Sequence, residues 1–200
     1  FAESPIVHPT FFATRKLFDK IGGYSNNPWA EDYDFILRAY GCGTRLAKHP
    51  EILVRKYFAP ERLSRVEAMY KRPAMFEAKV HYLLEFGRLK KRRGVLIVGS
   101  GPTGRQAAQS FANRGVRLLG FVDNRTGPPD RQVKNLPAWG FNNLPPEEFM
   151  HKFRDSLIVL AIGDSSGQRF FAEFLRKSDF VENHDFVRVI YNWPSAANSI

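Results

Sequence analysis

Two adjacent carboxylates, Glu31 and Asp32, open a segment whose apolar residues repeat with helical spacing from about residue 31 to 40. A carboxylate at a helix start, after a flexible loop, is well placed to take a proton from a hydroxyl group, and a neighbouring carboxylate can orient it. The alternative is structural, because the helix dipole favours negative charge in the first turn. The pair alone does not decide between these two roles.

A second group of candidate residues is a set of spaced glycines. Gly99, Gly101 and Gly104 follow the apolar run 95–98 and precede a helical pattern. Glycines in this position permit a tight turn and let a phosphate approach backbone N–H groups at the helix N-terminus. Asp123 closes the next predicted strand, 19 residues after Gly104, where an acidic residue meets a ribose hydroxyl. These four residues predict a nucleotide site; the alternative is a domain that keeps the turn but binds nothing.

The elements expected to position Glu31 and Asp32 are short. Thr14 can cap a helix that Gly22 and Gly23 end, since glycine readily takes the left-handed conformation at a helix terminus. Two short strands are predicted after the second helix, at 44–48 and 52–58.

From residue 61 to 87 the chain is predicted to be helical, with Pro73 beginning a new helix or kinking the first one. From Gly94 onward strands and helices alternate, which is typical of a parallel sheet covered by helices. The predicted strands are 95–98, 117–122, 157–162 and 186–190, and the predicted helices are 104–113, a short one from 145 and 166–177. The fold class is therefore α/β.

The composition and charge of the chain limit the classes of partner that it is expected to bind. The chain has 200 residues, a net charge of +10 and one cysteine, Cys42, so an intrachain disulfide is impossible. The densest basic run, 88–93, is either a solvated linker or a contact with an anionic membrane surface. We expect no nucleic-acid partner, because no recognised binding motif accompanies the charge.

The surroundings of Glu31 and Asp32 form an ordered pattern. It comprises His8-Pro-Thr10, Ile21-Gly-Gly-Tyr24, Trp29-Ala-Glu-Asp-Tyr-Asp34, Leu37-Arg38, Gly43 and Pro50-Glu51. This pattern resembles the second half of family 2 glycosyltransferases, which have the GT-A fold, over about residues 3 to 65.

The resemblance implies a set of roles. Asp32 would be the catalytic base and Glu31 its neighbour, and Gly22, Gly23 and Tyr24 would form the loop beside donor and acceptor. Trp29 would stack on a sugar ring, or alternatively pack against the helix.

Two departures from the family limit this expectation. The donor-binding half, with its metal-binding Asp-x-Asp motif, does not occur upstream of Phe1, so we expect a fragment that is inactive alone. The family's histidine after the Pro-Glu turn is also missing from Val54-Arg-Lys-Tyr-Phe58. No metal ligand is therefore assigned here, and a divalent Mg or Mn ion is expected only through residues absent from this chain.

The later region carries a second resemblance. Its pattern is Val95-Leu-Ile-Val-Gly-Ser-Gly-Pro-Thr-Gly104, Gly120-Phe-Val-Asp-Asn124, Leu136-Pro-Ala-Trp-Gly140, Ala161-Ile-Gly-Asp164 with Arg169, and Asp185-Phe-Val187. This resembles the Rossmann-like domain at the N-terminus of bacterial sugar O-acyltransferases. The resemblance implies a nucleotide-sugar ligand, with Asp164 as a weaker candidate contact. Acetyl transfer is not expected, because the acyltransferase repeats do not follow.

Together these patterns predict a half GT-A domain at 1–62, a helical basic linker at 63–93, a Rossmann-like domain at 94–191 and a tail at 192–200. The expected function is sugar transfer from a nucleotide-sugar to a glycan or lipid-linked hydroxyl acceptor in cell-surface polysaccharide synthesis. The expected location is the cytoplasm or the inner membrane face. Two alternatives remain: a nucleotide or nucleotide-sugar sensor without catalysis, and an NAD-dependent oxidoreductase or epimerase, for which no Tyr-x-x-x-Lys dyad follows the nucleotide site.

Overall fold

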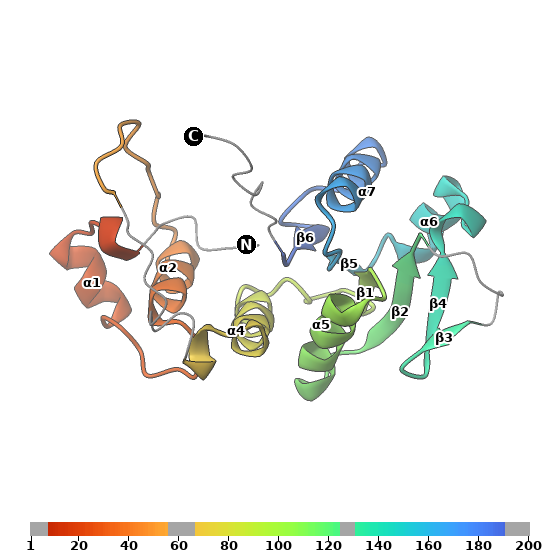
Figure 1. The fold of residues 1–200 in the computed structure, drawn as a ribbon, viewed down its shortest axis with the longest axis horizontal. Coiled ribbons are helices and arrows are strands. Elements are labelled where there is room, and N and C mark those ends of the chain that lie inside the picture. Colours follow the sequence, from red (N-terminus) through yellow and green to blue (C-terminus); the bar gives the residue numbers. More distant parts are fainter. Residues whose placement is uncertain (1–7, 56–66, 125–130, 191–200) are drawn as a thin grey trace. The chain divides into compact units, whose positions relative to one another are not determined.

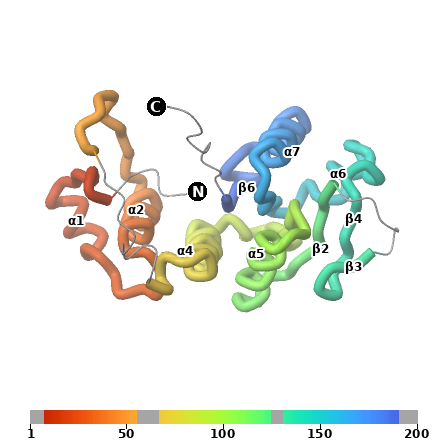
Figure 2. Tube along the Cα trace, in the orientation of Figure 1, coloured from red at the N-terminus to blue at the C-terminus, as the bar shows by residue number. Residues whose placement is uncertain are grey.

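The computed structural model describes residues 8–55, 67–124 and 131–190. The chain divides into two compact units, whose described residues lie within 8–82 and 83–190. Figure 2 traces the helical first unit from red to yellow and the sheet-containing second unit from green to blue. The boundary falls inside one helix, and the predicted domain limits at residues 62 and 93 stay predictions.

The second unit is built on a six-stranded sheet, and the predicted α/β class is confirmed (Figure 1). The strand order is β3-β4-β2-β1-β5-β6, in which only β3 is antiparallel to its neighbour. The strands are β1 (Val95–Val98), β2 (Leu118–Asp123), β3 (Gln132–Val133), β4 (Leu136–Gly140), β5 (Leu157–Leu160) and β6 (Phe186–Arg188).

Helices connect the parallel strands. They are α5 (Pro102–Asn113) after β1, α6 (Pro146–Phe153) after β4 and α7 (Ser165–Lys177) after β5. The chain moves from β1 to β2 and β4 on one side, then crosses to β5 and β6 on the other. The strand order therefore reverses between β1 and β5, where open α/β sheets bind ligands at the carboxyl ends of their strands.

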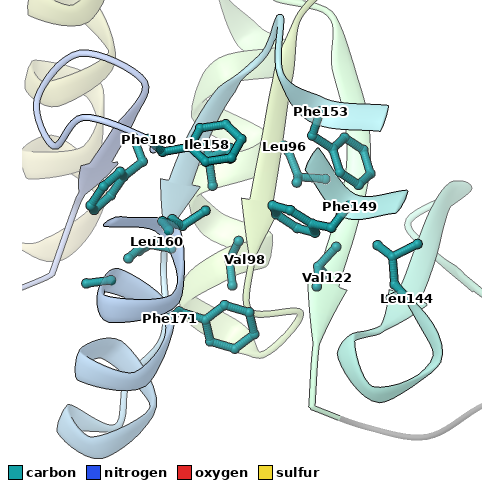
Figure 3. Packing of buried hydrophobic residues seen from close by; sticks show 13 residues of the cluster. Leu96, Val98, Val122, Leu144, Phe149, Phe153, Ile158, Leu160, Phe171 and Phe180 are labelled. Carbon is teal, nitrogen blue, oxygen red and sulfur yellow. The ribbon is translucent and has the colours of Figure 1, made fainter. Parts of the chain in front are cut away.

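A core of aromatic and aliphatic side chains holds α6 and α7 against one face of the sheet (Figure 3). Figure 3 shows Phe149 and Phe153 of α6, and Phe171 of α7, directed toward Leu96 and Val98 of β1. Every residue of β1 is buried. Since side chains alternate along a strand, the other half of β1 faces the opposite side of the sheet, where α5 contacts β1 and β2.

The first unit is helical in its described part. It contains η1 (His8–Thr10), α1 (Arg15–Ile21), α2 (Glu31–Gly41), η2 (Ala68–Tyr70) and most of α4 (Arg72–Glu85). Thr14 caps α1 by accepting from the Leu17 amide, and Gly22 ends α1 with φ +76°, both as predicted. Pro73 lies in the first turn of α4, so it begins a helix rather than kinking one.

Two predictions of strands are wrong in the described residues. Residues 44–48 and 52–55 form no strand, and Ile52 is 90% exposed. A strand needs a neighbour to pair with, and the described residues of the first unit supply none. Residues 56–58 and 61–66 lie outside the described ranges.

Among the helices of the described residues, none is long and apolar enough to cross a bilayer.

The hairpin of β3 and β4 was not predicted. Its turn residues, Lys134 and Asn135, have φ of +52° and +60°, which fits a two-residue turn that usually carries glycine. Pro137 within β4 also makes this strand hard to predict from the sequence, because proline is unusual in a sheet.

Candidate functional site

The predicted glycine loop lies between β1 and α5, at the carboxyl edge of the sheet. Gly99 has φ +106°, and a Cβ there would lie 2.9 Å from the Ala161 carbonyl oxygen. A Cβ on Gly104 would lie 1.7 Å from the Gly99 carbonyl oxygen. Both positions therefore require glycine for backbone packing alone, whether or not a ligand binds.

Gly101 is different from these two glycines. It is the N-cap of α5 with φ −69° and ψ −174°, a conformation that any residue adopts. A Cβ built on it would meet no atom within 4 Å. The fold does not demand glycine here, and the missing side chain leaves open space at the N-terminus of a 12-residue helix without acidic residues in its first turn. Such a terminus attracts anions.

Asp123 ends β2, and its carboxylate accepts hydrogen bonds from Ser100 and Arg131. Ser100 of the glycine loop donates its hydroxyl to one carboxylate oxygen. Arg131 donates to both oxygens, from Nη1 at 3.0 Å and from Nη2 at 3.2 Å, and its Nη2 also lies 3.0 Å from the Ser100 hydroxyl oxygen. The hydrogen bond to Asp123 raises the pKa of Arg131. This guanidinium therefore remains charged beside the loop.

A second guanidinium borders the same loop. Arg105, in the first turns of α5, donates to the Ser100 carbonyl oxygen at 3.2 Å. Asp164, the weaker candidate, is the N-cap of α7 and accepts from the Gly167 amide at 2.6 Å. Hydrogen bonds from Ser166 and Gly167 lower the pKa of Asp164, which is the ordinary behaviour of a capping carboxylate. The structure thus gives Asp164 a capping role.

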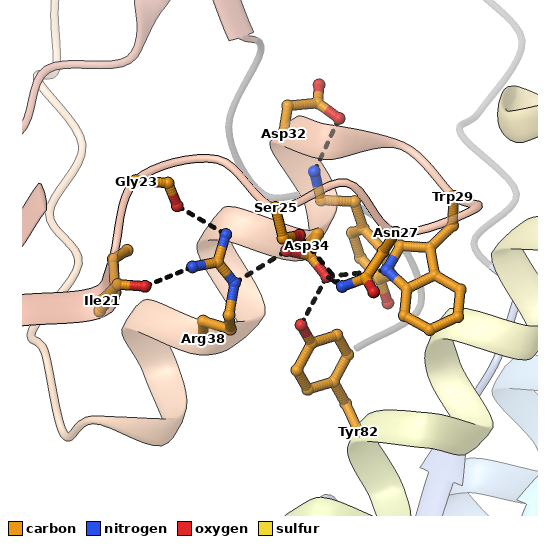
Figure 4. A network of polar contacts seen from close by, with 10 residues as sticks. Ile21, Gly23, Ser25, Asn27, Trp29, Asp32, Asp34, Arg38 and Tyr82 are labelled. Atoms are coloured by element: carbon orange, nitrogen blue, oxygen red, sulfur yellow. Dashed lines mark hydrogen bonds and ion pairs between the residues drawn. The ribbon is translucent and has the colours of Figure 1, made fainter.

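The first unit contains a denser polar network around Asp34 (Figure 4). The Asp34 side chain is fully buried and accepts five hydrogen bonds. The donors are Ser25, Asn27 at 2.8 Å, Trp29 Nε1 at 2.8 Å, Tyr82 at 2.6 Å and Arg38 Nε at 2.8 Å.

Arg38 extends this network to the end of α1. It donates to the carbonyl oxygens of Ile21 at 2.6 Å and Gly23 at 2.7 Å. Burial alone would raise the pKa of Asp34, but the hydrogen bonds it accepts outweigh burial and hold that pKa far below its ordinary value. The network ties α1, α2, α4 and the loop before α2 into one structure.

Glu31 and Asp32 lie at the start of α2, as predicted. Asp32 Oδ1 accepts from the Tyr33 amide at 2.7 Å, a helix-terminus contact. Glu31 accepts from the Tyr70 hydroxyl at 2.7 Å and lies 3.6 Å from His8 Nδ1. Burial and the hydrogen bond to Glu31 raise the pKa of Tyr70 to about 12.

The other residues predicted in this region divide into buried and exposed ones. Trp29 is 5% exposed, and its ring packs 5.2 Å from that of His81, so it does not present a stacking surface to solvent. Tyr24 is exposed and its hydroxyl lies 2.8 Å from His8 Nε2. Gly22 and Gly23 both have positive φ and form the turn after α1. Tyr24, His8, Asp32 and neighbouring apolar side chains line a shallow depression.

Sequence reasoning missed Ser100, Arg105 and Arg131 around the glycine loop. Ser100 and Arg105 stand within or directly after the glycine motif, and their proximity was readable. Arg131 follows a turn-rich segment, so only the folded chain reveals that it reaches Asp123.

Searches of protein-family models and of curated proteins find no match. The solved structures similar to the chain include RSP, a Rex-family repressor, and RSP in complex with β-NADH. Each is 17% identical with a TM-score of 0.41, and the matches cover 55% and 56% of this chain. The chain spans 58% and 59% of those structures, less than two thirds of their length. A likeness this distant does not transfer a function.

These neighbours contradict the predicted family and activity. They are Rex-family repressors rather than glycosyltransferases. Three predictions are therefore wrong: a half GT-A domain fused to an acyltransferase-type domain, an enzyme that transfers sugars, and a role in polysaccharide synthesis. A physical reason is visible in the first unit: Trp29, Asp34 and Arg38, which carried much of the pattern, are joined in a buried structural network.

The predicted partners are corrected by the same finding. One neighbour is a repressor in complex with β-NADH, whereas we predicted a nucleotide-sugar, a glycan or lipid-linked acceptor, an anionic membrane surface and no nucleic acid. The catalytic roles of Glu31 and Asp32 depended on the corrected activity, as did the expected Mg or Mn ion.

Proposed function

We propose that the second unit is a binding module for a nicotinamide adenine dinucleotide. The observation that carries the proposal is Gly101, where neither backbone conformation nor packing requires glycine. A ligand phosphate that approaches the backbone closely would account for a glycine at this open helix N-terminus. Gly99 and Gly104 supply the tight turn and the close helix packing that the same motif needs.

The second support is the position of the loop in the sheet. It follows β1, the strand beside which the strand order reverses, and the Ala161 amide binds the Val98 carbonyl across to β5 at 2.9 Å. A pyrophosphate at the N-terminus of α5 would place the adenosine ribose toward the end of β2, where Asp123, Ser100 and Arg131 meet.

We assign binding without catalysis. Asp123 is engaged by Ser100 and Arg131, so it is not poised as a base. The sequence also has no Tyr-x-x-x-Lys pair after the loop. A cytoplasmic location, where these dinucleotides are abundant, belongs to the same proposal.

The test is a fluorescence titration of the whole chain with NADH and with NADPH, for wild type and Gly101→Ala. Because the added methyl group meets no protein atom, the variant should fold normally and bind at least about tenfold more weakly. Equal affinity of the two proteins would show that the phosphate does not approach Gly101. Failure of the wild type to bind either dinucleotide would refute the proposed function.

A further inference from the structure

We propose that Arg131 makes this site select a dinucleotide that carries a phosphate on the adenosine ribose, as NADPH does, over one with a free ribose diol. The inference rests on the proposed function and names the ligand class of the same site. It starts from the pairing of Asp123, the residue that would otherwise hold the ribose hydroxyls.

Asp123 has little capacity left for a ribose. One carboxylate oxygen accepts from Arg131 Nη1, and the other accepts from both Ser100 and Arg131 Nη2. A ribose diol that bound this carboxylate would have to displace a bidentate guanidinium, which is among the stronger charged hydrogen-bond arrangements in proteins. The site therefore resists the binding mode that a free diol uses.

Exposure shows which member of the pair a ligand meets first. The Arg131 side chain is 18% exposed and the Asp123 side chain 9%. An incoming ribose accordingly encounters the guanidinium, whose positive charge attracts a ribose phosphate more strongly than a neutral hydroxyl.

Charge points in the same direction. An unpaired aspartate would repel a ribose phosphate, but Arg131 neutralises Asp123. Arg105, which donates to the Ser100 carbonyl oxygen at 3.2 Å, adds a second positive charge at the loop. The sum over Asp123, Arg131 and Arg105 is +1, which favours the dinucleotide with the larger negative charge.

Ser100 connects the two parts of the site. Its backbone belongs to the glycine loop, and its hydroxyl contacts both Asp123 and Arg131. The loop that would hold the pyrophosphate and the guanidinium that would hold the ribose phosphate are thus fixed relative to each other.

The experiment compares NADPH and NADH affinities by fluorescence titration for wild type, Arg131→Gln and the control Arg117→Gln. Arg117 is an exposed arginine just before β2, at the opposite end of that strand from Asp123. We expect wild type to bind NADPH at least about tenfold more tightly than NADH. Arg131→Gln should lose most of that preference by weakening NADPH, while Arg117→Gln should keep it.

The outcomes separate the two proposals. Binding of NADH as tight as NADPH by the wild type overturns the selectivity and leaves the proposed function standing, whereas binding of neither overturns the function. Should Arg131→Gln fail to fold, competition of the wild-type complex with adenosine 2′,5′-bisphosphate and with ADP decides instead. The bisphosphate should compete better, and equal competition would contradict the role of Arg131.

Discussion

Each unit of this chain contains a buried aspartate paired with an arginine, yet the two pairs lie in different settings. Asp34 is fully buried and accepts five hydrogen bonds, all from residues of its own unit. Asp123 lies at the carboxyl end of β2 beside a glycine loop, and its partner Arg131 remains 18% exposed. An aspartate–arginine pair thus belongs to an enclosed network in one unit and to a candidate ligand site in the other.

The difference teaches how to separate structural from functional polar residues. A carboxylate whose every lone pair is satisfied by enclosed side chains contributes to cohesion, because removing it leaves buried donors unpaired. The pair at the end of β2 lies next to a glycine that the fold does not need, and there we propose that a ligand binds. The most conspicuous sequence pattern in this chain belongs to the first kind.

The largest expected effect comes from breaking the enclosed pair. Asp34→Ala should lower the free energy of unfolding of the first unit by about 3–5 kcal/mol. The substitution removes the hydrogen-bond acceptor of Arg38 and of several buried donors. Urea denaturation, with amide exchange of α2 as the local probe, measures the loss. Asp123→Ala is the matched comparison. It should lower the free energy of unfolding of the second unit by less, because Arg131 can turn to solvent. A larger cost for Asp123→Ala would reverse the comparison.

The next effect separates two glycines of one loop. Gly104→Ala should destabilise the second unit by about 1–3 kcal/mol or more, because its Cβ would overlap the Gly99 carbonyl oxygen. Gly101→Ala should leave stability unchanged within about 0.5 kcal/mol. Thermal and urea unfolding of both variants give the answer. If the two cost the same, Gly101 has a structural role and the argument for a ligand there weakens.

A third prediction concerns acid. The pKa of Asp34 is lowered in the folded state, so its stabilisation is complete above the unfolded-state pKa of about 3.9 and is lost as pH falls toward the depressed folded value. Between pH 6 and pH 3 wild type should therefore lose about 1 kcal/mol more than Asp34→Asn, which does not titrate at this position. Parallel urea titrations at both pH values measure the difference. Identical losses would mean that the Asp34 pKa is not depressed.

The smallest effect on stability is expected at the hydrogen bond between Tyr70 and Glu31. Tyr70→Phe removes the hydrogen bond to Glu31 and should cost about 0.5–1 kcal/mol at most, because both groups are only partly buried. The same urea assay applies. A loss as large as that of Asp34→Ala would show that the contact between Tyr70 and Glu31 belongs to the enclosed network.

Much of the fold was readable from local patterns. The cap at Thr14, the stop at Gly22 and the alternation of apolar strands and helices from residue 95 depend on neighbours in sequence, and the structure confirms them. Residues 44–48 were predicted as a strand, and the structure has none there. Strand formation depends on a pairing partner, which local sequence does not reveal.

The candidate site was only half readable. Gly99, Gly101, Gly104 and Asp123 follow a local spacing that predicts a nucleotide loop. The ion pair from Arg131 to Asp123 and Ser100 depends on how the chain returns to the end of β2. The glycosyltransferase interpretation failed for the opposite reason, because residues such as Trp29 and Asp34 satisfied a motif while forming a buried network.

The most direct test of the central claim is hydrogen–deuterium exchange of the whole chain with and without saturating NADPH. A dinucleotide held at the N-terminus of α5 should slow amide exchange in residues 99–106 and leave α2, around Asp34, unchanged. That contrast would confirm that the second unit holds the ligand site and that the Asp34 network is structural. Unchanged exchange at 99–106, or slowing confined to α2, would contradict the account.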